Sequence, residues 1–421
     1  MTQMQMDKPK LYTPEGGIVL HNDNFVPGGI PYANNVANIL RSQLNRVKRT
    51  GPSFAELYGL NAGYLEGVMK GENPMTPEIV QAVERHSPLS AQELIAPGYR
   101  NRVPLIDDSK DGVVIVTAQQ RASTERTTQR GPEGRNFYKY GDPSMQRYSP
   151  IIPEWIQELY VHDGVNPDTP DWAFNKGHRE RQTTIFIGDV NFHWIDKEGN
   201  KYVVQTNTGD ANYIPPFVPH TFTTRDGNGL ILAITGLGAI GTQGFQQKIQ
   251  GMTLQEYQNI VQAELPMLAE ELATDKLNGI MFRRYADTST SDAGAYTMRT
   301  LMDGIPYQPN SRAVEINVKQ GGNPESLDID TPTDKWGYNT GNVPVVLYWE
   351  SHQQELGPGD SFSIQTNVPF AVRNTNGLEG KLVMMEVNPE KEDPMDLIAL
   401  INRHAGQKGV DRVHSEVMQW F

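Results

Sequence analysis

The sequence predicts a mixed α and β protein in which a helical module and a closed β-barrel follow each other twice. Three observations support this prediction: helical spacing of apolar residues between 35 and 70, short strand-like runs from 113 to 234, and a second helical and strand-like series after 252. A chain of 421 residues is long enough for several cores. The expected divisions are 1–105 (N-terminal arm and helical module), 106–245 (first barrel), 246–311 (second helical module) and 312–421 (second barrel with a C-terminal helix).

Composition narrows the classes of partner. Lys and Arg number 37 against 50 Asp and Glu, and the formal charge of -13 argues against nucleic acid or an anionic membrane as the main partner. Cysteine is absent, so any metal must be bound by His, carboxylate or amide ligands. The N-terminus lacks the apolar core of a signal peptide and no apolar run is long enough to span a bilayer, so we expect a cytoplasmic protein.

The first helical module reads as a helix-turn-helix. Val36, Ile39, Leu40 and Leu44 recur at helical spacing, and two shorter helical runs, 54–60 and 64–69, are joined through Gly59. Between Pro31 and Pro97 six basic and six acidic residues cancel to zero net charge, whereas a DNA-binding module carries a basic face. A helical module that packs on the rest of the chain is therefore favoured over a DNA-reading one.

The strand-like segments predict a barrel of the jelly-roll or cupin type. They alternate in polarity and are separated by turn residues, as in Asp226-Gly227. They cover 113–117, 137–140, 182–187, 202–205 and 230–234. Side chains from several strands of such a barrel can converge on one ion.

An ungapped alignment predicts that the second barrel is a copy that has lost its metal. Gly209 lies eleven residues before His220, and Gly359 lies eleven residues before Phe370. The same alignment places Ile214 on Ile364. Since Phe370 cannot ligate a metal, the second barrel is expected to be a scaffold, with its helical module repeating the first.

The candidate metal ligands are His178, Gln182 and His220. Two histidines with a polar side chain four residues after the first form an open-sided set of the kind that non-haem Fe(II) uses, although Gln182 stands where a carboxylate is usual. An interior amide bonded to a neighbour remains an alternative for Gln182. His193, the nearest other histidine, is expected to be packed or at the surface.

The chain resembles the phosphonate oxygenases built from helix-turn-helix and cupin modules, the hydroxyethylphosphonate dioxygenase-like family. Asn175-Lys176-Gly177-His178 looks like the family's Asn-x-Gly-His motif, and Pro219-His220 looks like its second histidine. The resemblance implies Fe(II) as the metal, dioxygen as co-substrate and no organic cofactor. It also implies a small phosphonate as substrate and a homo-oligomer, by resemblance a tetramer.

The resemblance also assigns residues to the substrate. Gln129-Arg130 and the segment from Phe137 to Tyr140 look like the family's anchoring segment, so Arg130, Tyr140 and Asn175 are expected to hold the phosphonate. Guanidinium, phenol and amide donors suit a tetrahedral dianion. Arg135 is a possible substitute for Arg130.

Two further positions carry the expected reaction. Lys48 matches a lysine that in this family enters the active site, here expected to reach Gln182 or bound oxygen in its own or a neighbouring subunit. A solvated lysine is the alternative. Ile214 stands where one branch of the family has a carboxylate, which implies the branch that splits 2-hydroxyethylphosphonate into methylphosphonate and carbon dioxide or bicarbonate. The alternatives are release of hydroxymethylphosphonate with formate, or a cupin-type sensor that regulates transcription.

Overall fold

The computed structural model describes residues 109–146, 151–236, 280–305, 311–320 and 333–387, apart from a few single positions and pairs, together with most of 48–86 and four residues of 37–44. The chain divides into two compact units. The first comprises Met1–Asp107, Gln246–Gln258 and Arg412–Phe421, and the second comprises Asp108–Phe245 and Asn259–Asp411. Within the part of the chain so described, no helix is long and apolar enough to cross a membrane.

The first unit contains short capped helices, α2 (Gly51–Tyr58), α3 (Ala62–Lys70) and α4 (Pro77–His86). Thr50 caps α2 by accepting the N–H of Ser53, and α2 ends at Gly59, whose φ of 63° is in the left-handed region that glycine adopts readily. Asn61 caps α3 in the same way. The predicted pair of helices meeting at Gly59 is therefore observed, around a core that includes Phe54 and Leu65.

The first barrel of the second unit consists of two antiparallel sheets. Seven strands run in the order β11-β8-β5-β10-β4-β3-β2, and three run in the order β7-β6-β9. Their bounds are β2 (Arg126–Arg130), β3 (Arg135–Gly141), β4 (Ile151–Glu158), β5 (Arg181–Ile187), β6 (Val190–Ile195), β7 (Lys201–Thr206), β8 (Ala211–Ile214), β9 (His220–Thr224), β10 (Leu230–Gly236) and β11 (Met281–Arg283). A short helix, η1 (Asp171–Ala173), precedes β5.

The second barrel repeats this order strand for strand. Its larger sheet is β1-β18-β15-β20-β14-β13-β12 and its smaller sheet is β17-β16-β19. The bounds are β1 (Val113–Val116), β12 (Thr290–Ala293), β13 (Tyr296–Met302), β14 (Arg312–Val318), β15 (Asp334–Asn339), β16 (Val345–Trp349), β17 (His352–Leu356), β18 (Ser361–Ile364), β19 (Phe370–Arg373) and β20 (Gly380–Val387). Two short helices, α6 (Ala118–Ala122) and η3 (Tyr285–Asp287), follow β1 and β11.

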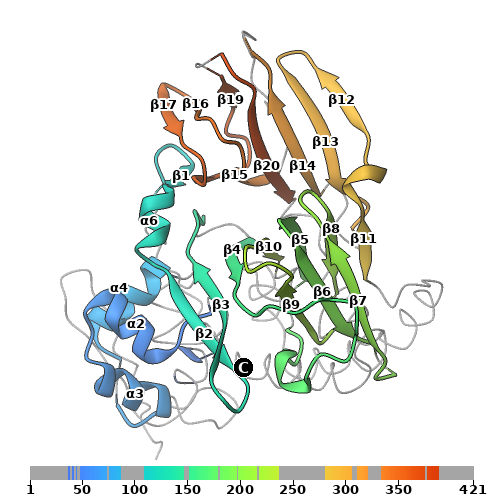
Figure 1. The fold of residues 1–421 in the computed structure, drawn as a ribbon. Helices are drawn as coiled ribbons and strands as arrows, with labels where there is room; N and C mark the ends of the chain where they lie inside the picture. Colours follow the sequence, from blue (N-terminus) through green and yellow to red (C-terminus); the bar gives the residue numbers. More distant parts are fainter. Residues whose placement is uncertain are drawn as a thin grey trace, which may run out of the picture. The chain divides into compact units, whose positions relative to one another are not determined.

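Each barrel completes its larger sheet with a strand that the chain order would assign elsewhere. β1 precedes the first barrel but pairs with β18 of the second, where Figure 1 shows it among the orange and red strands. β11 follows the first barrel and pairs with its β8. The carboxylate of Asp360 accepts the N–H of Ala118 at 2.7 Å, and that of Asp210 accepts the N–H of Tyr285 at 2.8 Å. Both added strands are thus clamped by matching aspartates just before β18 and β8.

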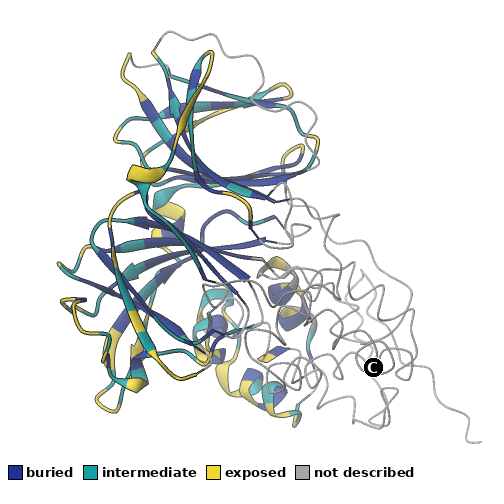
Figure 2. Cartoon of the chain, turned by 90° about the vertical axis from the view of Figure 1, so that its right-hand side faces the viewer, coloured by how far each residue is buried: buried dark blue, intermediate teal, exposed yellow. Residues whose placement is uncertain are grey.

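A shared apolar cluster joins the two barrels. It includes Ile151 and Trp155 of β4 and Trp336 and Tyr338 of β15, and the indole of Trp155 donates to the hydroxyl of Tyr338 at 3.2 Å. Figure 2 shows that the strands of both barrels are largely buried, while exposed residues concentrate in the turns. Since Trp155 points to the other barrel, its neighbours Glu154 and Ile156 face the interior of their own.

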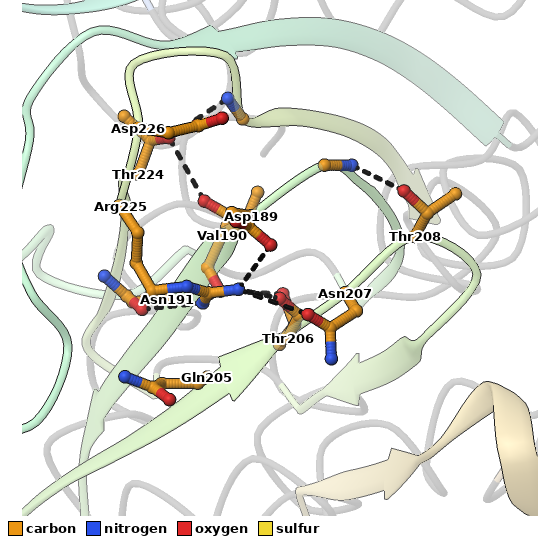
Figure 3. Close-up of polar contacts among 12 residues, drawn as sticks. Asp189, Val190, Asn191, Gln205, Thr206, Asn207, Thr208, Thr224, Arg225 and Asp226 are labelled. Carbon is orange, nitrogen blue, oxygen red and sulfur yellow. Dashed lines mark hydrogen bonds and ion pairs between the residues drawn. The ribbon is translucent and has the colours of Figure 1, made fainter.

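The open end of β9 is tied to the β6–β7 hairpin by Arg225. Its guanidinium donates to the carbonyls of Val190 and Thr206, both at 2.7 Å, and pairs with Asp189 at 2.8 Å (Figure 3). These bonds satisfy backbone carbonyls at the sheet end and hold β9, which carries His220, against β6.

Two sequence predictions need correction. Within 246–311, predicted as a second helical module, residues 281–302 contain the strands β11, β12 and β13, because they supply sheet edges to both barrels. Residues 113–116, assigned to the first barrel, belong to the sheet of the second. The predicted helix after Asp393 and the run from 252 to 272 lie outside the described residues.

Candidate metal centre

Backbone pairing brings the two histidine-bearing segments together. The N–H of Asn175 donates to the carbonyl of His220, and the N–H of His220 donates to the side-chain oxygen of Asn175, both at 3.0 Å. The same amide oxygen accepts the N–H of Gly177. Asn175 thereby fixes the approach to His178 beside the first residue of β9.

The three predicted ligands converge. Nε2 of His178 lies 3.1 Å from Oε1 of Gln182, and the rings of His178 and His220 are 5.0 Å apart and nearly perpendicular. Two ligands about 2.1 Å from an ion and at right angles to each other are about 3.0 Å apart, so the His178 to Gln182 separation suits neighbouring positions on an octahedral ion.

Hydrogen bonding orients the donor atoms. Nδ1 of His220 lies 2.8 Å from the carbonyl of Val218, which can only accept, so the proton is on Nδ1 and the lone pair of Nε2 accepts the side-chain N–H of Asn175 at 3.0 Å. The amide nitrogen of Gln182 donates to Thr184 at 2.9 Å, which turns Oε1 toward His178. Lone pairs that face each other across 3.1 Å repel unless a proton or a cation lies between them, so this set fits a divalent cation.

No carboxylate completes this set. Among the residues that the structure describes, no group of three His, Cys, Asp or Glu could hold a metal. Ile214, fully buried, is the cross-strand partner of Gln182 and offers no donor atom. A metal bound here would therefore have two imidazoles and one amide from the described residues.

The two candidate arginines are in different environments. Arg130 lies at the end of β2, with its guanidinium carbon 4.7 Å from the ring centroid of Tyr138, and it donates to the carbonyl of Ala173 close to Asn175. Arg135 is exposed and paired with Glu133 at 2.7 Å. This geometry favours Arg130 over Arg135 as an anion ligand.

Tyr140 and Tyr138 both line the interior. Burial, and then the charge of Glu154, raise the pKa of Tyr140 well above its ordinary value, so it is a neutral hydrogen-bond donor. Tyr138, which the sequence analysis did not single out, lies under Arg130 and accepts the N–H of Phe222 at 2.9 Å. Tyr138 lies two residues before Tyr140 on the same strand, and this spacing indicated that both side chains point to the same face of the sheet.

Sequence reasoning also missed the carboxyls of β4. Glu154 and Glu158 are buried in the first barrel, and neither oxygen of Glu158 has a hydrogen-bond partner among the described residues. A central strand with acidic residues at alternate positions was the available signal, since acidic side chains are rarely fully buried unless paired.

The remaining candidates lie elsewhere. His193 is fully buried between Thr169 and Thr223, and burial lowers its pKa to about 4, so the expected packed role is confirmed. Lys48, in the first unit, is half-buried and has a φ of 52°, unusual for a residue other than glycine. Its predicted role at Gln182 stays a prediction.

Comparison with known proteins gives relatives along the whole chain. No protein-family model matches. A methylphosphonate synthase from Nitrosopumilus maritimus is 27% identical over 99% of this chain and 98% of its own length. An (S)-2-hydroxypropylphosphonic acid epoxidase from Streptomyces wedmorensis is 26% identical over 30% of this chain and 59% of its own length.

Solved structures agree on the fold. A Streptomyces albus HEPD with 2-hydroxyethylphosphonate and Fe(II) bound matches with a TM-score of 0.58 and 22% identity, covering 85% of this chain and 93% of that one. A 2-hydroxyethylphosphonate dioxygenase variant matches with a TM-score of 0.52 and 17% identity, covering 84% and 94%. The resemblance predicted from the sequence is thus confirmed: this chain is an enzyme of the non-haem iron oxygenase type, related along almost its whole length to a methylphosphonate synthase.

Proposed function

We propose that this enzyme uses dioxygen to split the carbon–carbon bond of 2-hydroxyethylphosphonate, releasing methylphosphonate and bicarbonate. The atoms balance with one dioxygen per substrate, and all four electrons that reduce it come from the substrate. The observation that carries the proposal is the convergence of His178, Gln182 and His220 with Ile214 opposite. The full-length similarity to a methylphosphonate synthase supports the choice of substrate and product.

In the proposed centre, His178, Gln182 and His220 hold Fe(II), which supplies oxygen activation. Three neutral ligands leave the charge of a divalent ion uncompensated, which favours an anionic substrate. Thr184 keeps the amide oxygen of Gln182 turned toward His178, and the carbonyl of Val218 keeps the proton of His220 on Nδ1. Asn175, which donates to Nε2 of His220, would release that nitrogen to the ion.

The proposed phosphonate site uses Arg130, Tyr140 and Asn175. The guanidinium of Arg130 is held by the carbonyl of Ala173 and two aromatic rings, so little side-chain entropy remains to be lost on binding. Tyr140 stays protonated and can donate to a phosphonate oxygen. Held in this way, the hydroxyl-bearing carbon would be kept in one orientation next to the metal.

The decisive experiment is single-turnover chemistry read by phosphorus NMR. Protein loaded anaerobically with Fe(II) is mixed with 2-hydroxyethylphosphonate and then with oxygen. Methylphosphonate as the main phosphorus product is expected. Hydroxymethylphosphonate with formate would instead indicate the dioxygenase reaction, and unchanged substrate would contradict both.

We also propose that the two barrels are copies of one unit and that only the first retains a metal. The identical strand order, the matching aspartate clamps and a matching tyrosine support this. Tyr138 accepts the N–H of Phe222, and Tyr296 accepts the N–H of Val372 in the second barrel. One metal ion per chain is expected by elemental analysis, and two would contradict the proposal.

We propose that the side chain of Lys48 reaches Gln182 within a homo-oligomer. The left-handed backbone at Lys48 supports a special role, since strained conformations concentrate at functional sites. Lys48→Met should lower turnover, whereas Lys70→Met, which removes an exposed lysine paired with Glu66, should not. Equal turnover in the two variants would remove Lys48 from the mechanism.

A further inference from the structure

Glu158 is a fully buried carboxyl with no function in the scheme above. It ends β4, is 0% exposed, and neither of its oxygens has a hydrogen-bond partner among the described residues. Its direct cross-strand partner is Tyr138, so both side chains face the barrel interior. A buried carboxylate without partners is strongly unfavourable, so its charge needs a nearby cation or a proton.

Arg130 lies against Tyr138, the cross-strand partner of Glu158, and its positive charge acts on that carboxyl. Its guanidinium lies over the ring of Tyr138, 4.7 Å from the centroid, and is held there by the carbonyl of Ala173. Burial raises the pKa of Glu158 well above its ordinary value, and the charge of Arg130 is the one influence that lowers it.

Of the described residues near Glu158, the other groups do not supply a counter-charge. Tyr138 and Tyr140 on β3 are neutral, because burial raises the pKa of each. On β10, Ile231 and Ala233 are apolar. Glu154, on the same face of β4, is acidic and about 13 Å further along the strand at 3.3 Å per residue.

We propose that Glu158 is the internal counter-ion of Arg130 and takes up a proton when a phosphonate dianion binds Arg130. This inference rests on the proposed function, which makes Arg130 the phosphonate ligand. With the site free and the pH above the raised pKa of Glu158, the guanidinium offsets part of the charge of the carboxylate. Once the phosphonate neutralises the guanidinium, the carboxylate is left buried beside added negative charge, and protonation removes that cost.

The coupling is measurable by calorimetry. Anaerobic, Fe(II)-loaded protein is titrated with 2-hydroxyethylphosphonate at pH 8 in buffers of different ionisation enthalpy, and the slope of the observed heat gives the number of protons bound. Wild-type protein is expected to take up about one proton per ligand. Glu158→Gln should bind the ligand with that uptake lost, whereas the matched variant Glu154→Gln should keep it. Any proton that the ligand itself exchanges is common to all three proteins.

Affinity gives a second readout. Above the pKa of the free carboxyl, the wild-type dissociation constant should rise by up to about tenfold per pH unit, and in Glu158→Gln this rise should be absent. Should Glu158→Gln fail to fold, infrared difference spectra of the wild type should show a protonated-carboxyl band when ligand is added.

The outcomes separate this inference from the proposed function. Binding without proton uptake in the wild type, or equal uptake in Glu158→Gln, would overturn the role of Glu158 and leave the reaction untouched. If proton uptake were lost in Glu154→Gln and kept in Glu158→Gln, the proton would be bound by Glu154, and the proposed role of Glu158 would also be overturned. Absence of any binding heat in all three proteins would instead count against the substrate.

Discussion

The two barrels have the same strand order, but different kinds of side chain line their interiors. Gln182 pairs with Ile214 as Lys335 pairs with Ile364, so Lys335 stands at the position of Gln182. Its ammonium lies 5.9 Å from the ring of Phe370, which occupies the position of His220, and donates to the carbonyl of Thr333. The second barrel thus carries a cationic side chain where the first is proposed to hold a metal ion.

Two residues further along the same strands, the two barrels differ in how their interiors are packed. Thr184 and Asn212 pair in the first barrel, and Gly337 and Phe362 pair at the same positions in the second. The ring of Phe362 lies so close to Gly337 that a Cβ there would be 2.2 Å from it. In the first barrel both polar atoms of the Asn212 side chain are buried, with no hydrogen-bond partner in the described part of the chain. One barrel is filled by apolar contact, whereas the other keeps polar groups that cost stability, as functional sites do.

The largest expected effect tests the ligand position itself. Gln182→Ala should lower iron occupancy and turnover by about 100-fold or more, because it removes the one non-histidine donor of the set. Lys335→Met, the change at the matching position of the second barrel, should leave turnover unchanged. Metal analysis and product formation measure both, and normal activity in Gln182→Ala would discredit the assignment.

Next in size is a packing change in the second barrel. Phe362→Ala should lower the free energy of unfolding by about 3–5 kcal/mol, because it leaves a cavity over Gly337. Denaturant unfolding measures the loss, and the iron content of the folded fraction is the control. If that iron content fell as well, the packing of the second barrel would affect metal binding in the first.

A pH effect of similar size is expected from His193, whose counterpart in the second barrel is Tyr348. Burial lowers the pKa of His193 from 6.5 to about 4, so between these values the unfolded chain binds a proton that the folded chain excludes. The free energy of unfolding should fall by about 3 kcal/mol as the pH drops through this window. His193→Gln should flatten that part of the stability curve, measured by denaturant unfolding at each pH.

The smallest effect has the opposite sign. Asn212→Leu should raise the free energy of unfolding by about 1 kcal/mol, because an apolar side chain of similar size replaces a buried amide that has no hydrogen-bond partner among the described residues. Turnover should fall if the space around Thr184 serves the substrate. A destabilised Asn212→Leu protein would mean that the first barrel is packed as tightly as the second.

Residue type and spacing were enough to predict three side chains that converge in the first barrel, the strand segments and the glycine turns. Gly209 and Gly359 both have positive φ, 89° and 84°, and each leads into a buried strand, as the ungapped alignment required. The same reasoning failed for 281–302, where composition did not reveal edge strands, and it left Arg130 and Arg135 undecided. Local propensity could settle neither question, because both depend on which distant segment each strand pairs with.

The sequence alone therefore determined the kinds of donor available, since the absence of cysteine and the placement of His178, Gln182 and His220 are visible in the chain. Only the tertiary structure decided that β1 joins the sheet of the second barrel, that β11 joins the sheet of the first, and that Glu158 pairs with Tyr138 in the interior. The physical reason is that side chains alternate along a strand, so register with a remote partner decides which of them share an interior.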